Sequence, residues 1–192
     1  MLAGWIDEAV AAGLPAPNAM TLATADADGI PHARTVLATT VDATGVVLHS
    51  STPTTKTRDL AQNPHAAAVF HWPGLGRQVV LQGRAHELDA AASRAAYPTR
   101  PLQLKLLAWA YEELTPGLAA PDFAVETGAV ERAFDAAAAR PPAELTMPPS
   151  WTTVRLVADR VDFWRAGAEL VPPNKTRFVL GAGGWRSFPV LP

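Results

Sequence analysis

Residues 20–50 carry short apolar segments separated by tight turns, and this pattern limits the fold more than any other feature of the chain. Residues 20–25 are predicted to form a strand that ends at the turn "DADG", in which Asp28-Gly29 is a favoured hairpin dipeptide. A second strand follows near residues 31–39, and the turn "DATG" separates it from a third strand, "VVLHS". Strands this close together predict a three-stranded antiparallel meander and not alternating βαβ units.

The segment after the third strand, "STPTTKTRDLAQNP", has the composition of a short capped helix. Thr52 is the expected N-cap, Pro53 the first helical residue, and Asn63-Pro64 the end. Lys56 and Arg58 would then lie near a helix N-terminus, where free N–H groups and the helix dipole attract anions. Two interpretations stay open from composition alone: an anion site, or a capped surface helix with solvated charges.

The rest of the chain alternates between strands and a block of helices. Strands are predicted for "AAAVFHW", for "RQVVLQGRAHEL" with a bulge or bend at Gly83, and for the tail over residues 151–167 and 175–188. Helices are predicted within residues 89–97, 102–114 and 125–140, divided by proline-rich connections. The sequence therefore predicts a mainly β fold with peripheral helices (α+β), built as one domain over residues 1–192.

Charge and residue usage exclude several functions. The net charge is −2, so a nucleic-acid interface is not expected and any positive site must be local. Cysteine is absent, no apolar run approaches the ~20 residues of a membrane helix, and the first residues make a poor signal peptide. We therefore expect a cytoplasmic protein that contacts neither membrane nor nucleic acid.

The sequence carries no signature of a protein-based nucleophile or a metal site. Walker A, G-x-S-x-G and H-E-x-x-H motifs are missing, and the five histidines are scattered. We expect no metal site, and we identify no catalytic residue. An anion site without a nucleophile suits a bound cofactor that supplies the chemistry itself.

The order of four stretches resembles the pyridoxamine 5'-phosphate oxidase family. They are "AMTLATADADGIPHARTVLA", "GVVLHSSTPTTKTRDLAQNPHAAAVFHWPGLGRQVVLQGRAHEL", "TRPLQLKLLAWA" and "VDFW", between about residues 19 and 164. The resemblance implies an FMN-binding split β-barrel that works as a homodimer with FMN at the interface. It also implies oxidation of pyridoxine or pyridoxamine phosphate in pyridoxal phosphate biosynthesis, with hydride transfer to flavin N5 and dioxygen as acceptor.

The resemblance assigns roles to individual residues. Arg34 and Lys56 are expected to hold the FMN phosphate. The full set of cofactor residues that it implies is Arg34, Thr35, Val36, Leu37, His49, Ser50, Thr55, Lys56, Gln78 and Trp164.

The departures from the family pattern concern the substrate. A family lysine is replaced by Thr39, and a Tyr-Arg-Ser set becomes Ala96, Arg100 and Leu104. The motif R-L-H-D-R is replaced by "LVPPN", with Lys175 and Arg177 close behind. The candidate substrate residues are therefore Arg100, Thr39 and Arg177. Alternatives are a phenazine-type oxidase, a deazaflavin reductase, or a non-catalytic flavin or haem binder.

Overall fold

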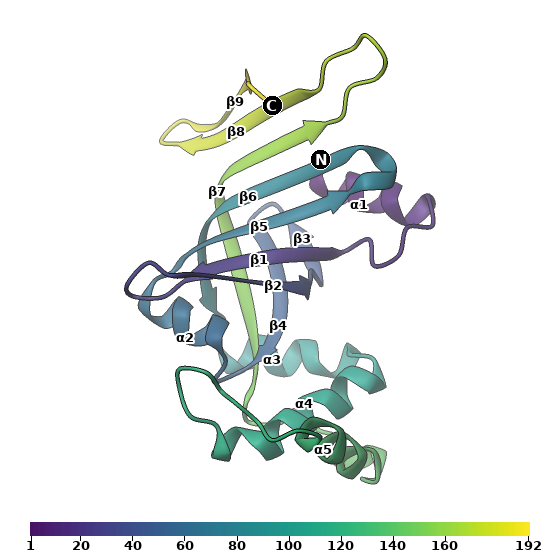
Figure 1. Cartoon of the computed structure of the whole chain (residues 1–192), viewed down its shortest axis with the longest axis vertical. Coiled ribbons are helices and arrows are strands. Elements are labelled where there is room, and N and C mark those ends of the chain that lie inside the picture. The colour runs from purple at the N-terminus through teal and green to yellow at the C-terminus, as the bar shows by residue number, and fades with distance from the viewer.

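The computed structural model describes residues 1–192 and consists of an antiparallel sheet with helices around it (Figure 1). The strand order is β2-β1-β5-β6-β7-β4-β3, and the β8–β9 hairpin pairs with β7. The strands are β1 (Ala19–Ala25), β2 (Pro31–Leu37), β3 (Thr40–Asp42), β4 (Gly45–Ser51), β5 (His65–Trp72), β6 (Arg77–Glu87), β7 (Trp151–Arg165), β8 (Asn174–Gly181) and β9 (Gly184–Val190). The mainly β architecture with peripheral helices is confirmed.

Five α-helices surround the sheet: α1 (Leu2–Ala11), α2 (Thr55–Gln62), α3 (Ala90–Ala96), α4 (Leu102–Leu114) and α5 (Ala129–Ala138). The helices α3, α4 and α5 gather at one end of the molecule, where β4 ends and β7 begins, and the β8–β9 hairpin lies at the other end (Figure 1). No helix has the length and apolar character needed to span a membrane.

The predicted three-stranded meander is wrong beyond its first hairpin. β1 and β2 pair as expected, with Ala25 opposite Pro31, but β4 pairs with β3 and β7 and not with β2. β7 has 15 residues, so it is long enough to pair with two different strands, one after the other, along the same edge. β4 pairs with residues 151–156 of β7 and β8 with residues 160–165. β2 therefore remains at the end of the strand order.

The bulge predicted at Gly83 is confirmed, since the register between β6 and β7 shifts at Gln82/Gly83. A Cβ atom at this position would lie 2.0 Å from the carbonyl oxygen of Val157. Only glycine allows the two backbones to approach this closely.

The core fills the inner face of the curved sheet. Met20, Leu22, Phe70 and Leu156 are fully buried there. α1 closes the core at the end near the β8–β9 hairpin, where Trp5 packs edge-on against Phe163 at a centroid distance of 5.0 Å.

Helix α2 begins two residues later than predicted. Its N-cap is Thr54 and not Thr52, because Thr54 and Thr57 form a capping box in which each side chain binds the other's backbone N–H. Lys56 is consequently the second residue of the helix, and the helix ends at Gln62 before Asn63, as predicted.

Candidate functional site

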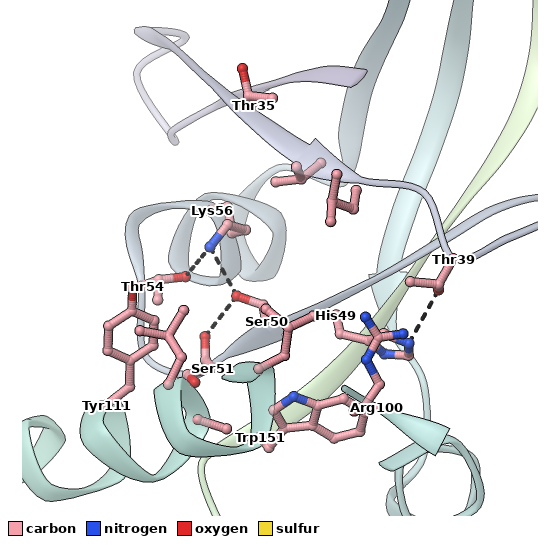
Figure 2. A pocket seen from close by; sticks show the side chains of 15 residues that line it. Thr35, Thr39, His49, Ser50, Ser51, Thr54, Lys56, Arg100, Tyr111 and Trp151 are labelled. Carbon is pink, nitrogen blue, oxygen red and sulfur yellow. Dashed lines mark hydrogen bonds between the residues drawn. The ribbon is translucent and has the colours of Figure 1, made fainter. Parts of the chain in front are cut away.

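A cavity of about 330 Å³ lies between β2, β4, the start of α2 and helix α4 (Figure 2). Its walls hold most of the predicted site residues. Those lining it are Thr35, Val36, Leu37, Thr39, His49, Ser50, Lys56 and Arg100. Leu104, which the sequence placed at a substrate position of the family, also lines it. Sequence reasoning did not assign Trp151 or the α4 side chains Leu107, Ala108 and Tyr111, which complete this wall. No carboxylate lines the cavity.

Lys56 is the cation at the α2 end of this cavity. Its Nζ donates to Ser50 Oγ at 2.9 Å and to Thr54 Oγ1 at 3.4 Å, and it forms no ion pair (Figure 2). Burial, followed by the nearby charge of Arg34, lowers the pKa of Lys56 from 10.5 to about 8. The backbone N–H groups of Thr55 and Lys56 belong to the first turn and have no intrahelical acceptor. This end of the cavity is therefore suited to an anion.

Arg34 does not line the cavity, but its charge is near enough to contribute to the lowered pKa of Lys56. Its Nη1 donates to Thr24 Oγ1 at 2.8 Å and to the carbonyl oxygen of Leu22 at 3.2 Å. Its Nη2 lies 3.9 Å from a carboxylate oxygen of Asp59. Neither Nη2 nor Nε makes a hydrogen bond, so two of its three nitrogens retain free donors.

His49 forms a neutral wall of the cavity. Its ring stacks on Trp151 with a centroid distance of 4.6 Å and an interplanar angle of 23°. Burial, followed by the charge of Arg100, lowers the pKa of His49 to about 4. His49 is consequently uncharged at neutral pH and cannot act there as a cationic acid.

Hydroxyl groups hold both ring nitrogens of His49. The Nε2 and Nδ1 atoms each lie 3.1 Å from a threonine oxygen, on Thr39 and Thr153 respectively. The Thr39 hydroxyl donates to the carbonyl oxygen of Val47, so it must accept from His49. The network thus assigns the proton of the neutral ring to Nε2.

Arg100 is the second cation of the cavity, and its side chain makes no hydrogen bond or ion pair. It follows the turn Tyr97–Thr99, and its guanidinium lies beside the His49 ring (Figure 2). The neighbouring α4 residues Leu104, Leu107 and Ala108 make the adjoining wall apolar. A free guanidinium fork next to flat aromatic and apolar walls suits a planar anionic molecule.

The remaining predicted residues do not reach this cavity. Thr55 starts α2 next to Lys56, but its side chain is not in the lining. Gln78 and Trp164 are cross-strand partners on β6 and β7. Trp164 lies thirteen residues beyond Trp151 along β7, a path of at most roughly 40 Å along the strand, and it is absent from the cavity lining.

Arg177 is held at the same distant end of the molecule. Its Nε and Nη2 each donate to a carboxylate oxygen of Asp162 at 2.9 Å. Arg160 and Lys175 also pair with this carboxylate. Arg177 is therefore part of a charge cluster on β7 and β8 and not of the cavity in its own chain.

Comparison with known proteins identifies relatives along most of the chain. A family model described as pyridoxamine 5'-phosphate oxidase matches residues 6–137. The pyridoxine/pyridoxamine 5'-phosphate oxidase of Salinispora arenicola is 42% identical over 182 residues, covering 94% of this chain and 79% of the relative. The pyridoxine/pyridoxamine 5'-phosphate oxidase 1 of Ralstonia nicotianae is 38% identical over 192 residues, covering 98% and 85%.

Solved structures share the fold at lower identity. PhzG from Burkholderia lata, solved with tetrahydrophenazine-1-carboxylic acid, superposes with a TM-score of 0.82 at 21% identity and covers 100% of this chain and 90% of its own. A pyridoxamine 5'-phosphate oxidase-related, FMN-binding protein from Nostoc punctiforme gives a TM-score of 0.76 at 20% identity, covering 98% and 96%. These likenesses confirm the split-barrel fold.

Proposed function

We propose, from the premise that the chain belongs to the pyridoxamine 5'-phosphate oxidase family, that it is an FMN-dependent oxidase of a small, planar, anionic substrate. One observation carries the proposal. The cavity contains two cations, Lys56 and Arg100, and no carboxylate to neutralise them. Such a site is prepared for two anionic groups, one from the cofactor and one from the substrate.

The residues at the start of α2 fit the phosphate of FMN. Lys56 would supply a charged donor, and the first-turn N–H groups would supply backbone donors. The charge of Arg34 lies close enough to Lys56 to contribute to its lowered pKa, and Arg34 would supply further donors. The hydroxyl of Ser50, which accepts from Lys56, keeps the ammonium aimed toward this end of the cavity.

When bound, FMN would supply the redox chemistry, a two-electron oxidation of the substrate with dioxygen as acceptor and hydrogen peroxide as product. The protein's own contribution is to bind and orient. Thr35, Val36 and Leu37 of β2 would line the flavin, and the stacked pair of His49 and Trp151 would form a flat wall. Arg100 would bind the anionic group of the substrate, so that its reacting carbon is held in one orientation.

A second copy of the chain would bring Gln78 and Trp164 to the cavity, and we propose a homodimer on this ground. The sheet face opposite the core carries small side chains where β1, β2 and β5 adjoin. Ala23 pairs with Ala33 on one side and Ala67 on the other. Small side chains of this kind allow another chain to approach the sheet closely, as a two-fold interface requires. Replacement of Trp164, distant from the cavity in its own chain, should then weaken FMN binding.

Pyridoxine and pyridoxamine 5'-phosphate are the first substrates to test, because the relatives at about 40% identity carry these names. A second candidate is an oxidase of a different planar anion. It is favoured by the surroundings of Arg100, whose neighbour Leu104 offers no hydrogen bond to a phosphate. A phosphate dianion that loses charge-assisted hydrogen bonds would lose roughly 1.5–3 kcal/mol for each.

The experiment is a steady-state assay of hydrogen peroxide with the FMN-loaded protein. Pyridoxamine 5'-phosphate is compared with pyridoxamine, which lacks the phosphate. Turnover that depends on the phosphate supports the family substrate. Turnover of a planar carboxylate in its place supports the second candidate, and no peroxide from any planar anion contradicts the proposal.

A further inference from the structure

Asp59 is the most completely buried acidic side chain near the cavity. It lies on α2, its exposed fraction is 0%, and one of its oxygens, Oδ2, accepts from Thr24 Oγ1 at 2.7 Å and lies 2.9 Å from His32 Nδ1. The other oxygen, Oδ1, lies 3.4 Å from Nη2 of Arg58. Burial of a carboxylate carries a large desolvation free energy even when the group is paired, so a buried ion pair often adds little to stability. We therefore looked for a role of Asp59 other than stabilising the fold.

The carboxylate connects two elements that carry the proposed phosphate ligands. Asp59 follows Lys56 by three residues, so both project from neighbouring turns of α2. Its partners come from the β1–β2 hairpin, where Thr24 is paired with His32 and Leu22 with Arg34. Since β2 ends the strand order, Asp59 fastens a strand with only one sheet neighbour to the helix.

The direction of the hydrogen bonds shows how Asp59 acts on Arg34. The Thr24 hydroxyl has one proton and donates it to Asp59, so it accepts from Nη1 of Arg34. The same Nη1 also donates to the carbonyl oxygen of Leu22. The guanidinium is thereby held through a single nitrogen, while Nη2 and Nε remain available to an anion.

We propose that Asp59 is a positioning residue that holds Arg34 beside Lys56, through Thr24, so that the two cations bind one phosphate group. The inference rests on the proposed function, because the phosphate in question is that of FMN. Asp59 itself touches neither cofactor nor substrate. The nearest approach of its carboxylate to Arg34 is 3.9 Å, and the intervening hydroxyl carries the contact.

The test compares FMN with riboflavin, which has the same ring and lacks only the phosphate. Dissociation constants are measured by flavin fluorescence for the full chain and for Asp59→Asn and Thr24→Val. Asp59→Asn keeps the shape of the side chain but removes its charge and replaces one acceptor oxygen by an NH₂ donor. That donor would face the groups that donate to Asp59 in the unaltered protein. Thr24→Val keeps the charge and the volume and removes only the connecting hydroxyl, so it serves if Asp59→Asn does not fold.

We expect both variants to raise the dissociation constant for FMN about 5- to 20-fold and to leave that for riboflavin within about twofold. Asp42→Asn is the matched control. It removes another aspartate that pairs with an arginine, Arg155, at the β3–β4 turn and outside the cavity, and it should change neither constant.

Three results would overturn the inference. Unchanged or tighter FMN binding in both variants would show that Asp59 does not position the phosphate ligands. Equal loss of FMN and riboflavin would assign Asp59 a packing role only. Failure of the unaltered protein to bind FMN would instead refute the proposed function, and the positioning role with it.

Discussion

Replacement of Lys56 by methionine should stabilise the protein and weaken its cofactor binding at the same time. The lowered pKa of Lys56, from 10.5 to about 8, means that the folded state holds this charge with difficulty. At about 1.36 kcal/mol per pKa unit, the penalty at pH 7 is about 3 kcal/mol. The variant also loses the hydrogen bond to Ser50, which costs it about 1 kcal/mol of stability. The free energy of unfolding without FMN should therefore increase by about 1–3 kcal/mol.

The pH dependence follows from the same shift. Between pH 8 and 10.5 the unfolded chain holds the Lys56 proton and the folded chain has released it, so stability rises with pH there. The advantage of Lys56→Met is thus greatest below pH 8 and vanishes toward pH 10.5. Lys56→Met should weaken FMN binding even though it stabilises the protein. The loss of one charge-assisted hydrogen bond of about 1.5–3 kcal/mol reduces the affinity for FMN roughly 10- to 100-fold.

The assay is thermal and urea denaturation at pH 7 and pH 10 with and without FMN. The control is Lys105→Met, since Lys105 donates to the carbonyl oxygen of Pro98 and lies outside the cavity lining. A Lys56→Met protein that is less stable than the unaltered protein at pH 7 without FMN would refute the electrostatic reasoning. Unchanged FMN affinity would refute the assignment of Lys56 to the phosphate.

Three further predictions concern the substrate end, the aromatic wall and the second copy. Arg100→Gln should raise KM for an anionic substrate about tenfold or more and leave the affinity for FMN unchanged. Steady-state kinetics measures the first effect and a flavin titration the second. A parallel loss of FMN affinity would contradict the separation of the two anion sites. The pKa of His49 is lowered to about 4, so the stability that the neutral ring contributes is present above pH 6.5 and is lost as the pH falls toward 4. His49→Asn should therefore flatten the acid side of a plot of unfolding free energy against pH. An unchanged plot would contradict the burial of a neutral His49. Trp164→Ala should weaken FMN binding several-fold with the cavity of its own chain intact, and a monomer that binds FMN at full affinity would exclude the second copy's role.

Local chemistry explains the parts of the fold that could be predicted. The Asp28-Gly29 turn, the helix end at Asn63 and the bulge at Gly83 each depend on residues adjacent in sequence. The pairing of β4 with β7 joins residues about a hundred positions apart, so it cannot be predicted from residues adjacent in sequence. Thr52 was expected to cap α2 because it precedes a proline, whereas the Thr54–Thr57 capping box determines the true start.

The candidate site depends on both kinds of information, local motifs and contacts between distant strands. The family resemblance located Lys56, His49 and Arg100, all of which line one cavity. It could not show that Trp151 stacks on His49, since that contact needs β4 and β7 to be neighbours. Asp59 was also missed, although its spacing of three residues from Lys56 on a predicted helix was a usable signal.

The most direct test of the central claim is the absorbance of the FMN-loaded protein when pyridoxamine 5'-phosphate is added without oxygen. We expect the protein to bind FMN, a planar anionic substrate to bleach the flavin band in near-stoichiometric amount, and admitted oxygen to restore the band with formation of hydrogen peroxide. If pyridoxamine 5'-phosphate leaves the band unchanged, a planar carboxylate should bleach it. A protein that binds no FMN, or a bound flavin that every planar anion leaves oxidised, would contradict the proposed function.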